Sequence, residues 1–174
     1  DEAKYLSFAN KMLQQDGRRI DADTFHYIYD VSQGITWYIQ SILHGIYDHH
    51  RVEIDKALAD SVVQEILGEQ TATYQNYLAW LTENQQNLLR AVASERLVEA
   101  PLSQDFIRAH HLPAPSSVKT ALNALVDKQL ITRTPKGYSV SDLFFAMWLI
   151  LVGSMLNPWK INSGWRSEKR TYRM

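Results

Sequence analysis

The stretch Thr82–Trp148 constrains the fold most, because it carries helix and strand signals in an order that few folds satisfy. Thr82 and Gln85 have the spacing of a capping box, in which the two side chains accept hydrogen bonds from free N–H groups at a helix start. Leucines and alanines then recur at helical spacing and predict one buried face. Ser103 follows a chain-breaking proline and is expected to cap a second, short helix from Gln104 to about His110.

A third helix and a hairpin complete this stretch. Pro113 and Pro115 predict a tight turn, since proline disfavours the α conformation in the residue before it. Ser116 is expected to cap the third helix, whose apolar residues form one stripe. Two β-prone runs, 130–133 and 138–140, flank a Pro-Lys-Gly turn and predict a β-hairpin. The order of helix, short helix, tight turn, long helix and hairpin predicts a winged helix-turn-helix.

The remaining residues predict a mainly α fold. Residues 1–50 are expected to form a bundle of three helices that end at glycines, and residues 51–81 two bridging helices. The winged helix-turn-helix with its one β-hairpin would occupy residues 82–148, followed in 149–174 by the end of a helix and a basic tail rich in aromatic residues. Helical spacing in the bundle places one face of each helix inward. The predicted inward residues are Tyr5, Phe8, Met12 and Leu13 in the first helix, Phe25, Ile28 and Tyr29 in the second, and Trp37, Ile39, Ile42, Leu43 and Ile46 in the third.

Charge and composition limit the function classes. The 174 residues hold 18 Lys and Arg against 19 Asp and Glu, so no overall field attracts nucleic acid or an anionic membrane. The absence of cysteine excludes disulfides and thiolate chemistry and is typical of a reducing compartment, so we expect a cytoplasmic protein. The longest apolar run, 143–156, is too short to cross a bilayer and is expected to be a buried helix. The chain begins at Asp1 rather than Met, and we expect it to be a piece of a longer protein or a chain from which residues have been removed.

Three runs of this sequence resemble a known family. Residues 25–47, which include YDVSQGITWYIQSILHGIY, resemble the helical lid that follows the nucleotide-binding core in archaeal-type P-loop ATPases of the STAND/AAA+ superfamily. The runs PSSVKTALNALVDKQLI and GYSVSDLFFAMWL resemble the winged helix that those ATPases carry next. The resemblance covers roughly residues 5–149, and it implies that the bundle is a lid and that the whole region lies C-terminal to an ATPase core.

The resemblance also implies a nucleotide-facing turn. In that family a Gly-x-Pro turn enters a helix that lies against the nucleotide, and here Gly34-Ile35-Thr36 takes its place, with Thr36 where proline usually stands. Gly34, Thr36 and Trp37 would then lie near ATP that the core of the parent protein holds with magnesium. The core itself is missing: no glycine is followed by lysine, so there is no P-loop to hold phosphates, and no apolar strand ends in Asp-Glu. We therefore expect a non-catalytic regulatory region whose partner is the upstream core.

No residue pattern marks a catalytic or metal site of its own. Ser116 and Lys119 have Ser-x-x-Lys spacing, but the companion motifs are missing and the serine lies where a helix start needs a cap. His44 and Asp48 share a helix face without a further ligand. We expect no catalytic residue, no cofactor and no metal in this chain.

Nucleic-acid binding is the alternative function. In a winged helix the third helix enters the major groove and the hairpin, or wing, touches the backbone or the minor groove. The side chains that would contact DNA are Ser117, Lys119, Thr120, Asn123, Arg133 and Lys136.

Residues 82–148 hold only seven Lys and Arg against six Asp and Glu, whereas DNA binding often neutralises roughly six to ten phosphates. We therefore favour a protein-contact role for the winged helix and keep a stand-alone DNA-binding transcriptional regulator as the alternative. A third reading is an adaptor that contacts a protein through exposed aromatic side chains such as Trp80 or Trp165.

Overall fold

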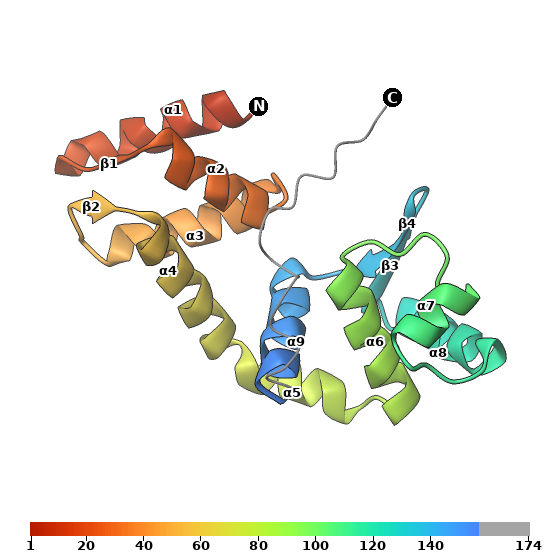
Figure 1. Cartoon of the computed structure of the whole chain (residues 1–174). Helices are drawn as coiled ribbons and strands as arrows, with labels where there is room; N and C mark the ends of the chain where they lie inside the picture. Colours follow the sequence, from red (N-terminus) through yellow and green to blue (C-terminus); the bar gives the residue numbers. More distant parts are fainter. Residues whose placement is uncertain (157–174) are drawn as a thin grey trace. The chain divides into compact units, whose positions relative to one another are not determined.

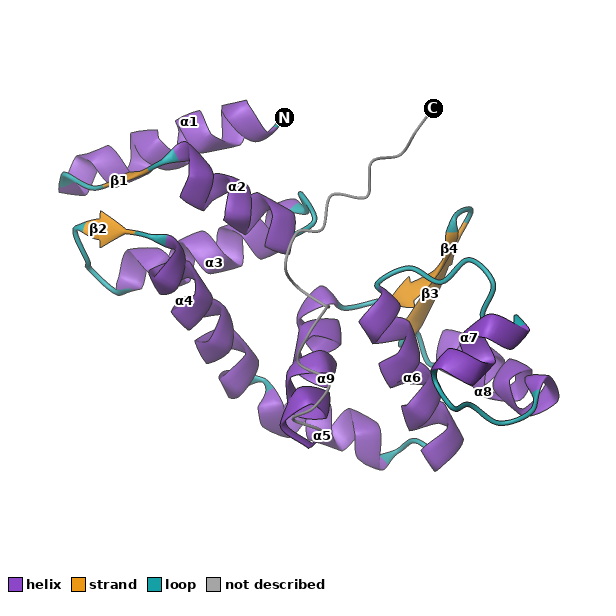
Figure 2. Ribbon diagram, in the orientation of Figure 1, coloured by secondary structure: helices purple, strands orange, loops and turns teal. Residues whose placement is uncertain are grey.

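The computed structural model describes residues 1–156, and the side chains of residues 1–153, and it divides the chain after Gln70 into two units. Figure 1 traces the chain through both units, and Figure 2 shows that helices dominate each of them. The first unit contains α1 (Glu2–Leu13), η1 (Gln14–Asp16), β1 (Arg19–Ile20), α2 (Ala22–Val31), α3 (Thr36–Asp48), β2 (Glu53–Ile54) and α4 (Lys56–Glu69).

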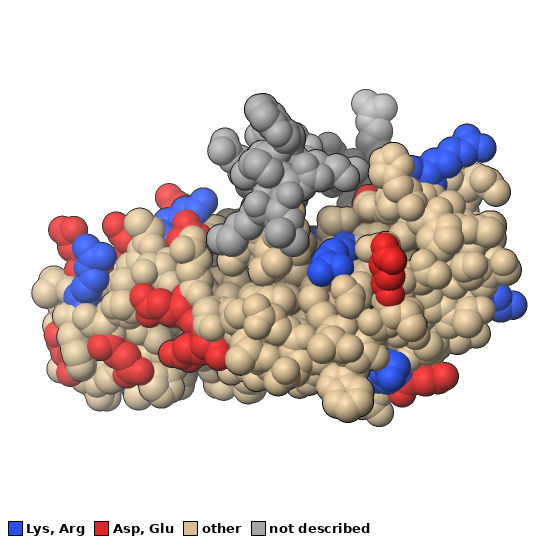
Figure 3. Space-filling model, turned by 90° about the horizontal axis from the view of Figure 1, so that it is seen from below, with Lys and Arg blue, Asp and Glu red and all other residues tan. Residues whose placement is uncertain are grey.

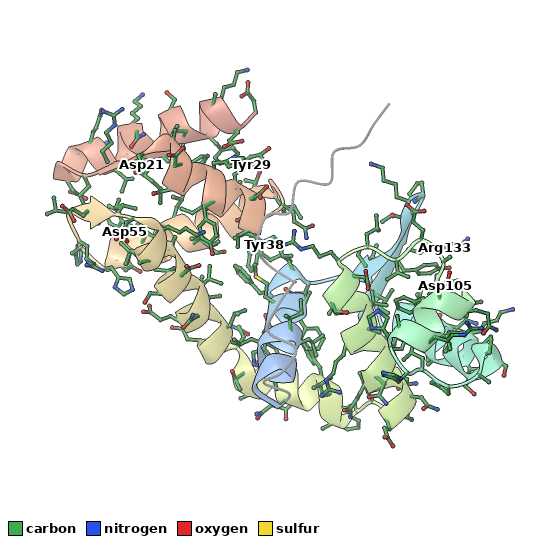
Figure 4. All side chains as sticks on the ribbon, viewed as in Figure 1. Asp21, Tyr29, Tyr38, Asp55, Asp105 and Arg133 are labelled. Atoms are coloured by element: carbon green, nitrogen blue, oxygen red, sulfur yellow. The ribbon has the colours of Figure 1, made fainter. Side chains whose placement is uncertain are left out.

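Aspartate caps and left-handed glycines set the helix ends of the first unit. Asp21 accepts a hydrogen bond from the backbone N–H of Thr24 at 2.7 Å and begins α2, and Asp55 begins α4 in the same way. Gly17 and Gly34 have φ angles of 70° and 68°, which only glycine adopts without strain, and they end η1 and the turn after α2. The predicted cap at Asp21 and the stops at Gly17 and Gly34 are confirmed, whereas α3 ends at Asp48 with His49 as its C-cap; Figure 4 labels both capping aspartates.

The core of the first unit is aliphatic with one phenylalanine, and part of the predicted inward set is wrong. Phe8, Met12 and Trp37 are exposed by 57%, 47% and 62%. On α1 the buried residues are Ala9 and Leu13, of which Leu13 was predicted; the stripe lies one position beyond Phe8 and Met12, and a shift of one residue turns it by about 100° around the helix. Trp37 lies outside the stripe of α3 for the same reason. The predicted inward residues Phe25, Ile28, Ile39, Ile42 and Ile46 are fully buried, and Ile20, Leu58, Ala59 and Val62 complete this core.

A short parallel strand pair, which was not predicted, joins two connections of the first unit. Arg19 pairs with Glu53 and Ile20 with Ile54. The Asn10 side chain holds the first strand to α1, since its amide donates to the carbonyl of Ile20 at 3.0 Å and its oxygen accepts from the N–H of Ile20 at 2.9 Å. Two-residue strands carry no alternation in the sequence, so no pattern marked them.

The second unit begins at Thr71 and contains the predicted winged helix-turn-helix. The capping box at Thr82 and Gln85 is present at the start of α6. The hairpin is antiparallel and pairs Ile131 with Val140 and Thr134 with Gly137, as its sequence indicated. Its helices and strands are α5 (Thr71–Ala79), α6 (Glu83–Glu95), α7 (Gln104–Ala109), α8 (Pro115–Asp127), β3 (Ile131–Thr134), β4 (Gly137–Val140) and α9 (Leu143–Leu156).

One capping prediction in this unit is wrong. Helix α8 begins at Pro115, with Ala114 at the N-cap and no side-chain capping bond, so Ser116 lies inside the first turn. Proline favours the first helical position because its fixed φ suits the helix and its missing N–H costs no hydrogen bond there. The predicted cap of the short helix α7 at Ser103 is confirmed, with its side chain accepting from the N–H of Phe106.

Helices α5 and α9 join through aromatic side chains. The ring of Tyr74 lies 4.9 Å from that of Phe145 and 5.6 Å from that of Trp148, and the indole N–H of Trp148 donates to the hydroxyl of Thr71 at 3.1 Å. Of the segment 51–81 that we expected to bridge, α4 therefore lies in the first unit and α5 in the second. The predicted fold class, mainly α with one β-hairpin and a winged helix, is confirmed.

Candidate functional site

The outer face of α8 is polar because its apolar residues recur every three or four positions on the other face. Val118, Ala121, Leu122 and Leu125 are buried. The side chains predicted to contact DNA lie opposite: Lys119, Thr120 and Asn123 are exposed and Ser117 is half-buried. The structure thus brings together the four predicted residues of this helix. Only one of them is charged.

The hairpin carries the other two predicted residues. Arg133 and Lys136 are exposed, and the guanidinium of Arg133 lies 5.9 Å from the centre of the Tyr138 ring. Figure 4 labels Arg133 on this hairpin. The turn is held by the hydroxyl of Thr134, which donates to the carbonyl of Gly137 at 3.1 Å and accepts from the N–H of Lys136 at 3.3 Å. The two cations therefore project from a locally fixed turn.

Gly137 lets a further piece of backbone lie against the hairpin. Its φ is 141°, a value that side-chain-bearing residues rarely adopt, and a Cβ there would lie 2.5 Å from the carbonyl oxygen of Val98. Val98 and Tyr138 exchange two backbone hydrogen bonds of 2.9 Å, so the connection between α6 and α7 adds a one-residue third strand. The sequence did not predict this pairing, because one residue forms no strand pattern.

A groove of about 680 Å³ lies beside the hairpin, where Val98 pairs with Tyr138. Its lining combines two cations, one carboxylate and apolar surface from an exposed leucine, a proline and a half-buried tyrosine. The lining residues are Leu97, Glu99, Arg133, Thr134, Pro135, Lys136, Gly137 and Tyr138. The sequence predicted Arg133 and Lys136 as contact residues but not Tyr138 of β4, nor Leu97 and Glu99, which reach the groove through the pairing of Val98 with Tyr138.

The charges around the winged helix are nearly balanced. Residues 71–153 hold seven Lys and Arg and six Asp and Glu. Figure 3 shows one face of the molecule, on which Lys and Arg are scattered with Asp and Glu among them. Asp127 is exposed one turn beyond Asn123 on α8, and Glu99 lies in the groove. A field that attracts a polyanion is therefore weak on this unit.

The residues that the resemblance places near nucleotide meet at the start of α3. Gly34 turns the chain, and a Cβ there would lie 2.8 Å from the hydroxyl of Tyr29. Thr36 is the first residue of α3, whose N-terminus has no side-chain cap, and the exposed Trp37 ring lies edge-on to Tyr38 at 4.9 Å. The structure thus gathers Gly34, Thr36 and Trp37 on one turn, and their contact with ATP stays a prediction.

Histidines in this chain pair with carboxylates one at a time. His49 lies 2.8 Å from Glu65, and His44 lies 3.0 Å from Asp48. The hydrogen bond from His49 holds the pKa of Glu65 below its usual range. Within residues 1–153 no group of three or more potential ligands is placed to hold a metal ion. No helix of the described chain is long and apolar enough to cross a membrane.

One comparison with known proteins gives a match. The model of a family described as a probable winged helix domain matches residues 72–150, from α5 to α9. The chain contains a winged helix domain. The matched span begins in α5, the helix that packs on α9, and the predicted domain start at residue 82 stays a prediction. Comparison with curated proteins and with solved structures found no match.

Proposed function

We propose that this chain is a non-catalytic interaction region whose winged helix domain contacts a protein partner. One observation carries the proposal: the outer face of α8 and the hairpin together offer three exposed cations, Lys119, Arg133 and Lys136. Tight DNA binding commonly neutralises about six to ten phosphates, so this surface suits a partner that needs fewer charge contacts. Most protein interfaces are only modestly charged and depend on a few well-packed side chains.

At finer detail, we propose that the region belongs to the C-terminal part of a P-loop ATPase in the cytoplasm. The first unit would act as a lid over ATP and magnesium held by the core, with Gly34, Thr36 and Trp37 nearest the nucleotide. Such a lid responds to nucleotide only if it interacts differently with the ATP-bound and ADP-bound core. The winged helix domain would then pass that difference on as a changed contact with its partner. The resemblance and the exposure of Trp37 at the start of α3 support this proposal.

Two measurements test the ATPase proposal. The natural sequence upstream of Asp1 is expected to contain Gly-x-x-x-x-Gly-Lys-Ser/Thr within a few hundred residues, and its absence there would refute the proposal. In the longer protein, Trp37→Ala is expected to change the rate of ATP hydrolysis, whereas Trp80→Ala, which removes another exposed tryptophan, leaves that rate unchanged. Equal rates for the Trp37 variant and the wild type would also contradict the lid.

A stand-alone DNA-binding regulator is the second candidate. The clustering of Lys119, Thr120 and Asn123 on one exposed face of α8 favours it, because Asn can read adenine and Lys can bind guanine or phosphate in the major groove. A mobility-shift assay at low and moderate salt separates the candidates. Sequence-specific binding at moderate salt that is lost in the Lys119→Ala and Arg133→Ala variants would establish the regulator and refute the protein-contact proposal.

A further inference from the structure

We propose that the groove beside the hairpin binds an extended segment of a protein partner in which a carboxylate stands next to an apolar side chain. The inference rests on the proposed protein-contact function and names the surface and the chemistry of the contact. The groove is formed by two parts of the winged helix domain, residues 97–99 and the hairpin tip 133–138, which the Val98–Tyr138 pairing holds together.

The cations of the groove are free to bind a carboxylate. Among the residues that the structure describes, neither Arg133 nor Lys136 takes part in an ion pair. The guanidinium of Arg133 lies over the Tyr138 ring, 5.9 Å from its centre, and the planar fork of a guanidinium matches a carboxylate with two parallel hydrogen bonds.

The apolar part of the groove can hold an apolar side chain that stands next to the carboxylate in the ligand. Leu97 is 40% exposed although it precedes a buried valine, and the Tyr138 ring is half-buried under Arg133. An apolar side chain of the ligand that covers Leu97 and Tyr138 removes apolar surface from water on both partners. The volume of about 680 Å³ lies within the usual range of about 300–1,000 Å³ for ligand sites, enough for a few side chains of an extended segment.

A peptide fits this groove better than a nucleic-acid backbone. Glu99 lies in the lining, and its charge repels the row of phosphates that a duplex presents on both sides of any contact. A single carboxylate can bind Arg133 and Lys136 while its apolar neighbour, rather than a second anion, faces Glu99. The mixed charge thus selects a segment with one acidic group over a polyanion.

Fluorescence anisotropy on the whole 174-residue chain tests the inference. The probe is a fluorescein-labelled peptide of Gly and Ser that holds one Asp next to one Leu, and the competitors are the same unlabelled peptide with Lys in place of Asp and a short DNA duplex. We expect the acidic peptide to bind and neither competitor to displace it. Binding is expected to weaken about tenfold in the Arg133→Ala/Lys136→Ala variant and about threefold for Leu97→Ser, since exposed charge pairs contribute up to about 1 kcal/mol each. Glu99→Gln is expected to bind about twofold more tightly.

Lys128→Ala is the matched control, because Lys128 is an exposed cation at the end of α8 outside the groove. All substituted side chains are exposed, so the variants are expected to keep the wild-type circular dichroism spectrum. No binding of the acidic peptide, equal weakening in the Lys128 control, or displacement by the duplex would each overturn the inference. A partner that binds the groove variants as tightly as wild type, but not variants of α8, would refute the groove and leave the protein-contact function standing.

Discussion

The two units of this chain differ in charge and in what holds their helices together. Residues 1–70 contain twelve Asp and Glu against six Lys and Arg, whereas residues 71–153 contain six against seven. In the first unit, polar pairs join different helices: His26 contacts Glu2 between α2 and α1, and the Tyr27 hydroxyl donates to Asp60 between α2 and α4. In the second unit, aromatic rings join α5 to α9. The second unit also has one such pair, since His110 at the end of α7 lies 3.1 Å from Glu95 of α6. The first unit therefore holds more of the described pairs whose strength responds to pH and salt.

A buried arginine shows how far the first unit relies on polar contacts. Arg18 is 4% exposed, and its guanidinium donates to the carbonyl of Tyr47 at 3.0 Å and to Asp16 at 3.2 Å while lying 4.6 Å from the centre of the Tyr47 ring. Hydrogen bonds from Tyr47 and then Arg18 hold the pKa of Asp16 below its usual range. The contacts tie the loop after η1 to the end of α3. A buried charge that lost them would be costly, so this loop is held in one place.

The largest expected effect lies in the aromatic core of the second unit. Phe145 is fully buried among Tyr74, Tyr77 and Trp148. Phe145→Ala is expected to lower the free energy of unfolding by about 3–5 kcal/mol, because it removes apolar contact and leaves a cavity. Urea unfolding followed by tryptophan fluorescence measures the loss. Trp80→Ala, at an 82% exposed position, is the control and is expected to change stability by about 0.5 kcal/mol or less.

Replacing one glycine in each unit by alanine compares a strained backbone position with an open one. Gly137→Ala in the second unit is expected to cost about 1–3 kcal/mol, because φ is 141° and the new Cβ would lie 2.5 Å from the Val98 carbonyl oxygen. Gly68→Ala in α4 of the first unit meets nothing within 4 Å and is expected to stabilise the helix by about 0.5–1 kcal/mol. Opposite signs in thermal unfolding are the expected result. A Gly137→Ala variant as stable as the wild type would show that the hairpin does not need the close approach of the Val98 carbonyl.

The hydroxyl of Tyr27 tests whether polar contacts between helices stabilise the first unit. Burial, together with the hydrogen bond to Asp60, raises the pKa of Tyr27, so the phenol stays protonated and donates. Tyr27→Phe is expected to lower stability by about 1–2 kcal/mol, because Asp60 is then left without its donor. Amide hydrogen exchange localises the loss, which is expected in α2 and α4. Tyr5→Phe, whose hydroxyl has no such bond in the structure, is the control, and an equal loss there would contradict this role for Tyr27.

The smallest effect expected is a pH dependence of the stability of the first unit. The hydrogen bond to Glu2 raises the pKa of His26 above its ordinary 6.5, and the nearby Asp30 and Asp23 act in the same direction. A raised pKa in the folded state means that the stabilisation is fully present below pH 6.5 and is lost as pH rises through the folded value. The temperature at which half of the first unit is unfolded is therefore expected to decrease as the pH is raised from 6 to 8. This decrease is expected to be smaller in the His26→Gln variant. An equal pH dependence of stability in both units would contradict the difference that we expect between them.

Local signals in the sequence predicted most of the fold. The caps at Thr82 and Asp21, the glycine ends and the hairpin turn each depend on neighbouring residues, so a pattern reveals them. The strand pair of Arg19 with Glu53 and the bridge of Val98 with Tyr138 depend on residues far apart in the chain, and no pattern marks them.

The candidate site divides in the same way. Lys119, Asn123, Arg133 and Lys136 were predicted because helix periodicity and hairpin position fix which way they face. Leu97 and Glu99 were missed, since they reach the groove only when the connection between α6 and α7 packs against β4. The aromatic and basic residues expected in 149–174, Trp165 among them, lie outside the described residues.

The salt dependence of DNA affinity tests the central claim, that the winged helix domain contacts a protein and is not built to read DNA. Each phosphate contact contributes about −0.9 to the slope of log K against log salt. Three exposed cations on α8 and the hairpin therefore predict a slope no steeper than about −3, with the same weak affinity for every duplex sequence. A slope of about −6 or steeper, with one sequence bound far more tightly than the others at physiological salt, would contradict the account.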